Sequence, residues 1–151
     1  MSNILKIGLI SLAMILFAIP AYSDSINIPS NGQVIIVPKN VNGQFFVTGK
    51  IYGQEISFLV DTGAADIILS KKDALSIKGL QMTPSNRTII TGGGIINSYV
   101  TQADMWMGNT PFFSTIMYIN PTDQPYSVLG MSMLLKFSLV YISHGELHLV
   151  P

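Results

Sequence analysis

The stretch at residues 58–64 reads Phe-Leu-Val-Asp-Thr-Gly-Ala. Its three apolar residues predict a short buried strand that runs directly into the carboxylate of Asp61. Gly63 and Ala64 follow with little side-chain bulk, so the backbone can turn closely beneath that carboxylate. An aspartate held there by backbone N–H groups is poised for chemistry rather than merely solvated. The stretch therefore predicts a functional carboxylate at the end of a buried strand.

The sequence on either side of this stretch is mostly strand-like, with short runs rich in Val, Ile, Phe and Tyr separated by Gly, Asn and Pro. The predicted strands are Gln33–Val37, Phe45–Ile51, Ile56–Val60, Ile67–Ser70, Arg87–Thr91, Ile95–Met107, Phe112–Ile119, Ser138–Ile142 and Glu146–Val150. Two short helices are expected, at Lys71–Leu75 and Met131–Phe137. Ser70 is the predicted N-cap of the first, with Asp73 in the acidic position of a capping box. Many short strands with two helical turns predict one mainly β domain built as a closed or nearly closed barrel.

The first 23 residues have the features of a secretory signal peptide. Lys6 precedes the apolar run 7–19, and Ala21 and Ser23 occupy the −3 and −1 positions of a cleavage site. The apolar run is shorter than the about 20 residues that span a bilayer. We therefore expect an exported protein, periplasmic or secreted, with an uncleaved N-terminal membrane anchor as the alternative.

The composition excludes several classes of function. Charged residues make up 11% of the chain, against about 25% in an average soluble domain. The formal net charge is zero and no basic stripe is present, so we expect no nucleic-acid partner. The chain has no Cys, which excludes a disulfide framework, a thiol nucleophile and a Cys-based zinc site. No carboxylate cluster accompanies His144 and His148, so we expect no metal and no cofactor.

The motif and its surroundings resemble the retropepsin-like aspartic proteases. Asp61-Thr62-Gly63-Ala64 is similar to the signature of that family. Thr91-Gly92-Gly93-Gly94-Ile95 resembles the flap hairpin that closes over substrate, and Val128-Leu129-Gly130 resembles the element that threads behind the catalytic loop. Met131–Leu135 then resembles the helix of the family. The resemblance covers roughly Gln44 to Val150 and is greatest to the small exported, single-domain bacterial members.

This resemblance implies a retropepsin-like acid-protease barrel over residues 44–151, with one short C-terminal helix and activity as a homodimer. Residues 24–43 would form an N-terminal extension or strand. The implied site residues are Asp61 as the catalytic group, Thr62, Gly63 and Ala64 as its support, Asp66, Gly92, Gly93, Gly94 and Ile95 at the substrate or in the flap, and Leu129 and Gly130 behind the catalytic loop.

Two of these residues have a more specific implied role. In the family, the residue at Thr62 forms hydrogen bonds across the dimer axis. Asp66 stands where retroviral members place an acidic residue near substrate side chains. The preceding residue in those members is often a second acid but here is Ala65, so a surface role for Asp66 stays open.

The number of motifs predicts the oligomeric state. None of the other aspartates is followed by Thr-Gly or Ser-Gly, whereas two-lobed aspartic proteases carry two such motifs in one chain. A twofold axis would bring the Asp61 residues of two copies together. Two facing carboxylates share one proton, so the pair can both accept and donate a proton.

The sequence thus predicts an aspartic endopeptidase that hydrolyses a peptide or protein substrate. Two alternatives stay open. One is a catalytically inactive peptide-binding or assembly module of the same fold, and the other is an anchored scaffold protein of the cell envelope. The intact Asp-Thr-Gly motif and the Gly-rich hairpin favour the enzyme.

Overall fold

The computed structural model describes residues 33–91 and 94–151. The predicted signal peptide at residues 1–23 lies outside these described residues. Within the two described segments, we find no helix with the length and apolar character needed to span a bilayer.

The described chain forms ten strands and two short helices. In chain order these are β1 (Ile35–Pro38), β2 (Phe46–Ile51), β3 (Gln54–Val60), β4 (Ile68–Ser70), α1 (Lys71–Ser76), β5 (Thr83–Thr91), β6 (Gly94–Met107), β7 (Thr110–Asn120), β8 (Ser127–Leu129), α2 (Met131–Leu134), β9 (Leu139–Ser143) and β10 (Glu146–Val150).

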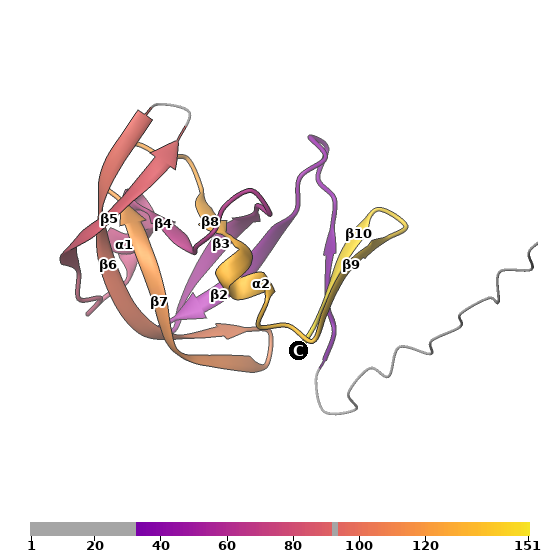
Figure 1. The fold of residues 1–151 in the computed structure, drawn as a ribbon. Helices are drawn as coiled ribbons and strands as arrows, with labels where there is room; N and C mark the ends of the chain where they lie inside the picture. The colour runs from indigo at the N-terminus through magenta and orange to yellow at the C-terminus, as the bar shows by residue number, and fades with distance from the viewer. Residues whose placement is uncertain (1–32, 92–93) are drawn as a thin grey trace, which may run out of the picture.

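Six strands close into a barrel, in the order β2-β3-β8-β4-β7-β6 (Figure 1). Strand β6 pairs back with β2 through Gly49↔Met107 and Ile51↔Met105, which closes the ring. Strand β5 lies outside the ring and pairs only with β6 among the described strands, so β5 and the start of β6 project as a hairpin. The mainly β, barrel-forming domain predicted from the sequence is confirmed.

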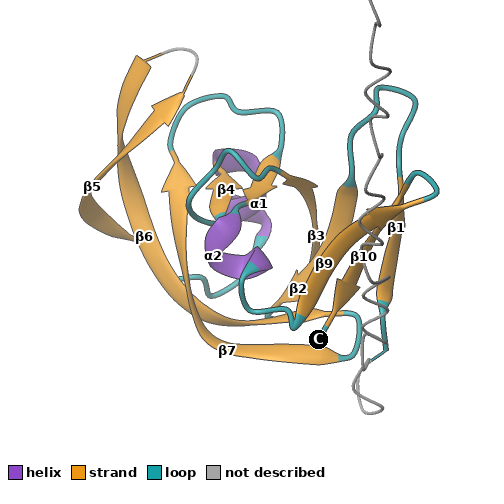
Figure 2. Cartoon of the chain, turned by 45° about the vertical axis from the view of Figure 1, so that its right-hand side comes forward, coloured by secondary structure: helices purple, strands orange, loops and turns teal. Residues whose placement is uncertain are grey.

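A separate three-stranded sheet lies beside the barrel, in the order β1-β10-β9 (Figures 1 and 2). Strand β1 pairs antiparallel with β10 through Ile35↔Leu149 and Val37↔Leu147. The beginning and the end of the described chain therefore lie side by side. The buried side chains of Val37, Leu147 and Leu149 join the same core cluster as the barrel residues.

The core is filled from every side of the barrel. Phe58 on β3, Leu69 on β4, Met105 on β6, Met117 on β7 and Leu129 on β8 are all fully buried. Burying one such side chain stabilises the fold by roughly 1.5–3 kcal/mol. Alternating burial along β6 follows the period of two that a half-buried strand requires. Packing of these side chains holds the strand ends, and the loops that follow them, in fixed positions.

Most predicted boundaries differ from the observed ones by one or two residues, and three elements differ by more. Strand β5 begins at Thr83 rather than Arg87, and a register shift lies between Pro84 and Thr88. Residues 83–86 were not predicted as strand, because their Pro, Ser and Asn residues favour turns. Helix α2 ends at Leu134 rather than Phe137, since Lys136 and Phe137 donate to carbonyls only three residues back. Strand β8 was not predicted as a strand, because three residues are too short to show a period.

The predicted capping box of α1 is only half formed. Ser70 Oγ accepts a hydrogen bond from the backbone N–H of Asp73 at 3.1 Å, as an N-cap does. The Asp73 carboxylate, however, accepts from Ser127 Oγ at 2.6 Å, and Ser127 Oγ accepts from the backbone N–H of Ser70 at 3.0 Å. The buried Ser127 hydroxyl on β8 thus links the Ser70 N–H to the Asp73 carboxylate, which would bond directly in a complete capping box. It ties the start of α1 to the strand that leads behind the Asp61 loop.

Candidate active site

Asp61 is the first residue after β3, which pairs antiparallel with β2 and parallel with β8. Its backbone N–H donates to the carbonyl of Leu129 at 3.1 Å, and its carbonyl accepts from the N–H of Ala64 at 3.2 Å. Its Oδ1 accepts from the N–H of Gly63 at 2.8 Å. The backbone of Asp61 is therefore fixed by the barrel, while its carboxylate remains exposed and oriented by the turn that follows.

The segment from β8 into α2 supports the loop from behind. The N–H groups of Met131 and Ser132 donate to the carbonyls of Ala64 and Ala65, both at 2.8 Å. The approach is so close at Gly130 that an added Cβ would lie 2.5 Å from the carbonyl oxygen of Ala64. Only glycine fits between these backbones.

The hairpin of β5 and β6 carries the residues that were predicted as a flap. The register pairs Ile90 with Ile95 and Thr91 with Gly94. Gly94 has φ 117°, a backbone conformation that strongly favours glycine. Ile90 and Ile95 are 82% and 74% exposed, so two paired apolar side chains near the end of this hairpin are largely accessible to solvent. Gly92 and Gly93, the other two predicted flap residues, lie outside the described residues.

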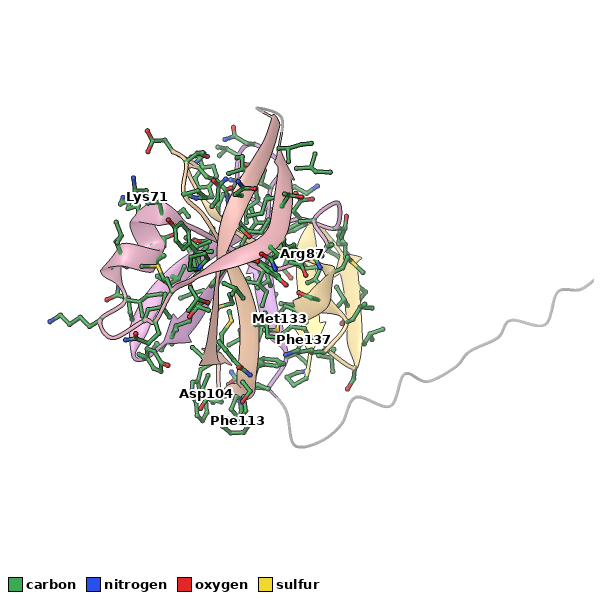
Figure 3. All side chains as sticks on the ribbon, turned by 60° about the vertical axis from the view of Figure 1, so that its left-hand side comes forward. Lys71, Arg87, Asp104, Phe113, Met133 and Phe137 are labelled. Atoms are coloured by element: carbon green, nitrogen blue, oxygen red, sulfur yellow. The ribbon has the colours of Figure 1, made fainter. Side chains whose placement is uncertain are left out.

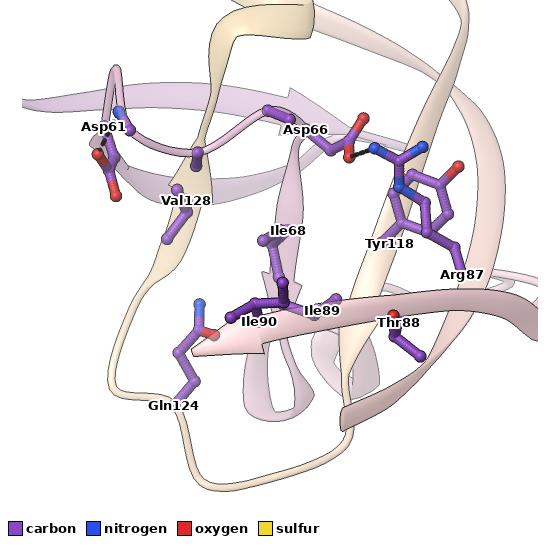
Figure 4. A pocket seen from close by; sticks show the side chains of 13 residues that line it. Asp61, Asp66, Ile68, Arg87, Thr88, Ile89, Ile90, Tyr118, Gln124 and Val128 are labelled. Atoms are coloured by element: carbon purple, nitrogen blue, oxygen red, sulfur yellow. Dashed lines mark hydrogen bonds and ion pairs between the residues drawn. The ribbon is translucent and has the colours of Figure 1, made fainter. Parts of the chain in front are cut away.

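A groove of about 570 Å³ separates the Asp61 loop from the first arm of this hairpin (Figure 4). Its lining comes from the loop, from β4, from the β5 arm of the hairpin, from β7 and from the chain around β8. These residues are Asp61, Gly63, Ala64, Ala65, Asp66, Ile68, Arg87, Thr88, Ile89, Ile90, Tyr118, Gln124 and Val128. The isoleucines and Val128 give the groove an apolar floor next to the carboxylate of Asp61.

An ion pair stands at the other end of the groove, away from Asp61 (Figure 4). Arg87 Nη2 on β5 lies 2.5 Å from Asp66 Oδ2 on the Asp61 loop. The Arg87 guanidinium also lies over the ring of Tyr118, 5.1 Å from its centroid. The hairpin arm and the loop are thus in direct electrostatic contact.

The structure brings several of the predicted site residues together. Asp61, Gly63, Ala64 and Asp66 line the groove, and Asp66 is an ion-pair partner rather than a free surface residue. Thr62 is exposed, and its hydroxyl forms no hydrogen bond to any residue that the structure describes. Leu129 and Gly130 lie behind the loop, and Ile95 lies on the hairpin but not in the groove lining.

Sequence reasoning missed part of this groove. It assigned no role to Arg87, Thr88, Ile89 or Ile90, although they form the arm that leads into the Gly-rich turn. The two strands of a hairpin lie side by side, so the strand before the glycines could have been predicted to line the same groove. Tyr118 and Gln124 carry no local signal, because only the barrel closure brings them to the groove. The described segments hold no cluster of three or more His, Cys, Asp or Glu side chains suited to a metal ion.

A family model described as "gag-polyprotein putative aspartyl protease" matches residues 47–136, which include the Asp61 loop, the hairpin and α2. The chain belongs to the retropepsin-like aspartic protease family. The crystal structure of a retropepsin-like aspartic protease from Rickettsia conorii superimposes on this retropepsin-like chain with a TM-score of 0.65 and 31% identity. That match covers 78% of this chain and 90% of the Rickettsia chain. The predicted family and fold class are confirmed.

A retroviral enzyme has the same fold. The EIAV protease, in complex with the inhibitor HBY-793, matches with a TM-score of 0.58 over 66% of this chain and 93% of its own. At 20% identity, this likeness concerns the fold alone.

Two curated proteins resemble this retropepsin-like chain in sequence. The uncharacterized protein RP867 of Rickettsia prowazekii (strain Madrid E) is 32% identical over 127 residues, which is 79% of this chain and 50% of that protein. An uncharacterized protein encoded in the cobV 5' region of Sinorhizobium sp. is 30% identical over 139 residues, 87% of this chain and 58% of that protein. The chain therefore spans only about half the length of these relatives.

Proposed function

We propose that this protein is an aspartic endopeptidase whose active site pairs two Asp61 residues across the axis of a homodimer. The observation that carries the proposal is the exposed Asp61 carboxylate, oriented by the Gly63 N–H at one end of a groove beneath a hairpin. A second carboxylate is needed to hold the proton that the first lacks. A second copy of the chain supplies it with the same geometry.

The paired carboxylates divide the work of hydrolysis. The ionised carboxylate accepts a proton from a water molecule, and the water oxygen attacks the peptide carbonyl carbon. The protonated carboxyl group donates its proton to the carbonyl oxygen, which gives a neutral tetrahedral diol. In the second step the carboxyl group that took the proton from water donates it to the leaving nitrogen, the C–N bond breaks, and the other carboxylate accepts the proton of one diol hydroxyl as the carboxylic acid product forms. The dyad is then left with one proton shared by two groups.

The groove suits an extended peptide. A strand-like substrate can hydrogen-bond to the hairpin as an added strand, with alternate side chains pointing into the groove. Ile68, Ile89, Ile90 and Val128 face the side chains that would lie near Asp61. Apolar residues beside the scissile bond are therefore the expected preference.

Activity should depend on protein concentration, because the dimer axis divides the active site. When the protein is diluted below the dissociation constant of the dimer, hydrolysis per milligram should fall as mass action requires. Peptide cleavage and sedimentation velocity are measured over the same dilution series. A constant specific activity in a monomeric sample would rule out the shared site.

The rate of hydrolysis should have a bell-shaped dependence on pH with its maximum at mildly acidic pH. The dyad works only with one proton, so protonation of both groups and ionisation of both groups each stop the reaction. The test is cleavage of a denatured protein or a peptide library between pH 3 and 9. A rate that still rises between pH 7 and 9 would indicate a different chemistry, and no cleavage at any pH would favour the peptide-binding module.

We also propose that the protein is exported, on the basis of the sequence of residues 1–23. N-terminal sequencing of the protein from the envelope of an expressing bacterium tests this. A mature chain beginning at Asp24 supports cleavage after Ser23, and an intact Met1 in the membrane fraction supports the anchored alternative.

A further inference from the structure

The end of the groove that carries Arg87 differs in character from the end that carries Asp61. Between the two ends the lining side chains are mainly those of isoleucines and Val128, with Thr88 and Gln124 as polar members. Arg87 is the only cationic residue among the lining residues that the structure describes. Figure 4 shows its guanidinium beside the Asp66 carboxylate and the Tyr118 ring. A peptide that lies along the groove therefore meets a fixed cation at some distance from the bond to be cut.

Arg87 keeps hydrogen-bonding capacity for a ligand. A guanidinium has five N–H donors in a planar fork, and Asp66 is its one ion-pair partner among the described residues. The Arg87 side chain is 50% exposed, whereas that of Asp66 is 24% exposed. The accessible member of the pair is thus the cation, and the donors that remain suit a carboxylate.

The surroundings hold this cation in place. The Tyr118 ring lies beneath the guanidinium, which favours one orientation of it through a cation–π contact. The backbone at Arg87 is fixed as well, since its carbonyl accepts from Ser98 Oγ at 2.7 Å. A side chain already ordered by Asp66 and Tyr118 loses less conformational entropy when a ligand binds.

We propose that Arg87 is a specificity-determining residue that binds an acidic side chain of the peptide substrate, Glu or Asp, at a position away from the scissile bond. This inference rests on the proposed function for the identity of the ligand as a peptide. The acidic side chain lies on the edge of the guanidinium opposite Asp66. The substrate is then apolar near the cut and acidic at this one distal position.

The test separates binding from catalysis. A randomised peptide library is panned against the Asp61→Asn protein, and selected peptides are resynthesised with Glu, Gln or Lys at each position. At one position Glu should bind about fivefold tighter than Gln, the effect expected of a half-exposed charge pair, and Lys should bind more weakly than both. The preference for Glu should vanish in Asp61→Asn/Arg87→Met. It should reverse toward Lys in Asp61→Asn/Arg87→Glu.

Lys50→Met is the matched control. Lys50 is 54% exposed and pairs with Glu55 at 3.1 Å on the β2–β3 hairpin, so its loss removes a similar cation that lies outside the groove. The Glu preference should persist in Asp61→Asn/Lys50→Met. Arg87→Gln, which keeps a polar side chain of similar reach, is measured as well in case the methionine variant does not fold.

Three results would overturn the role of Arg87: no position that prefers Glu, a Glu preference that survives Arg87→Met, or no peptide bound at all. Cleavage of the selected peptides by the wild-type protein is assayed separately. Selection of Glu without cleavage would contradict the protease proposal alone. Cleavage without selection of Glu would contradict the Arg87 proposal alone.

Discussion

Asp61→Asn is expected to lower kcat/KM for peptide hydrolysis by at least about 10³-fold, equivalent to roughly 4 kcal/mol of transition-state stabilisation. Asparagine has nearly the shape of aspartate, but it can neither accept the proton of the attacking water nor hold a proton for the carbonyl oxygen. In the proposed homodimer both halves of the dyad change at once, since each protomer would contribute the same residue. Steady-state cleavage of a peptide substrate measures the effect.

The fold should survive this change. The Gly63 N–H that donates to Asp61 Oδ1 at 2.8 Å can donate equally to the amide oxygen of asparagine. The backbone contacts of residue 61 do not involve its side chain. The melting temperature and the dimer mass should therefore stay close to those of the wild type.

Asp104→Asn is a closely matched control. Asp104 Oδ1 accepts from the backbone N–H of Ser114 at 2.8 Å, which is the same kind of contact at the same length. Figure 3 shows Asp104 near Phe113, at the end of the molecule opposite the tip of the hairpin. This variant should cleave at the wild-type rate. If Asp61→Asn retained more than about a tenth of wild-type activity, Asp61 would not be the catalytic group.

The sequence predicts best those parts of the site whose geometry is local. The apolar run before Asp61 forms β3, the small residues after it form the turn, and the glycine after Leu129 allows the close approach behind the loop. Each of these features depends on a few adjacent residues. The side-chain volume and backbone freedom of these residues follow directly from their identities in the sequence.

Features that depend on barrel closure could not be predicted in the same way. Strand β8 is three residues long and exists because β3 and β4 lie on either side of it. Ser127 reads as an ordinary polar residue, yet its hydroxyl is fully buried and completes the cap of α1. The Arg87–Asp66 pair forms because the hairpin arm lies across the groove from the loop. In each case the partner is set by packing of distant segments and not by local pattern.

Gly130→Ala is expected to have the largest effect on stability. Its backbone has φ −93° and ψ −171°, which alanine adopts without strain, so any cost comes from contact alone. The added Cβ would lie 2.5 Å from the carbonyl oxygen of Ala64 and closer still to that of Asp66. Neither atom can move without shifting the loop. Overpacking of this kind costs about 3 kcal/mol, which lowers the melting temperature of a domain of this size by about 10 °C.

Activity should fall together with stability in Gly130→Ala. A shift of the β8–α2 segment moves the Leu129 carbonyl that accepts from the Asp61 N–H, so the two carboxylates of the proposed dyad would lose their alignment. Gly79→Ala is the control, because a Cβ there meets nothing within 4 Å and only its φ of 81° is unfavourable. That variant should lose about 1 kcal/mol and keep wild-type activity. Thermal melting and peptide cleavage are measured on both proteins. Equal melting temperatures for the two variants would mean that the segment behind the Asp61 loop is not packed as tightly as the structure has it.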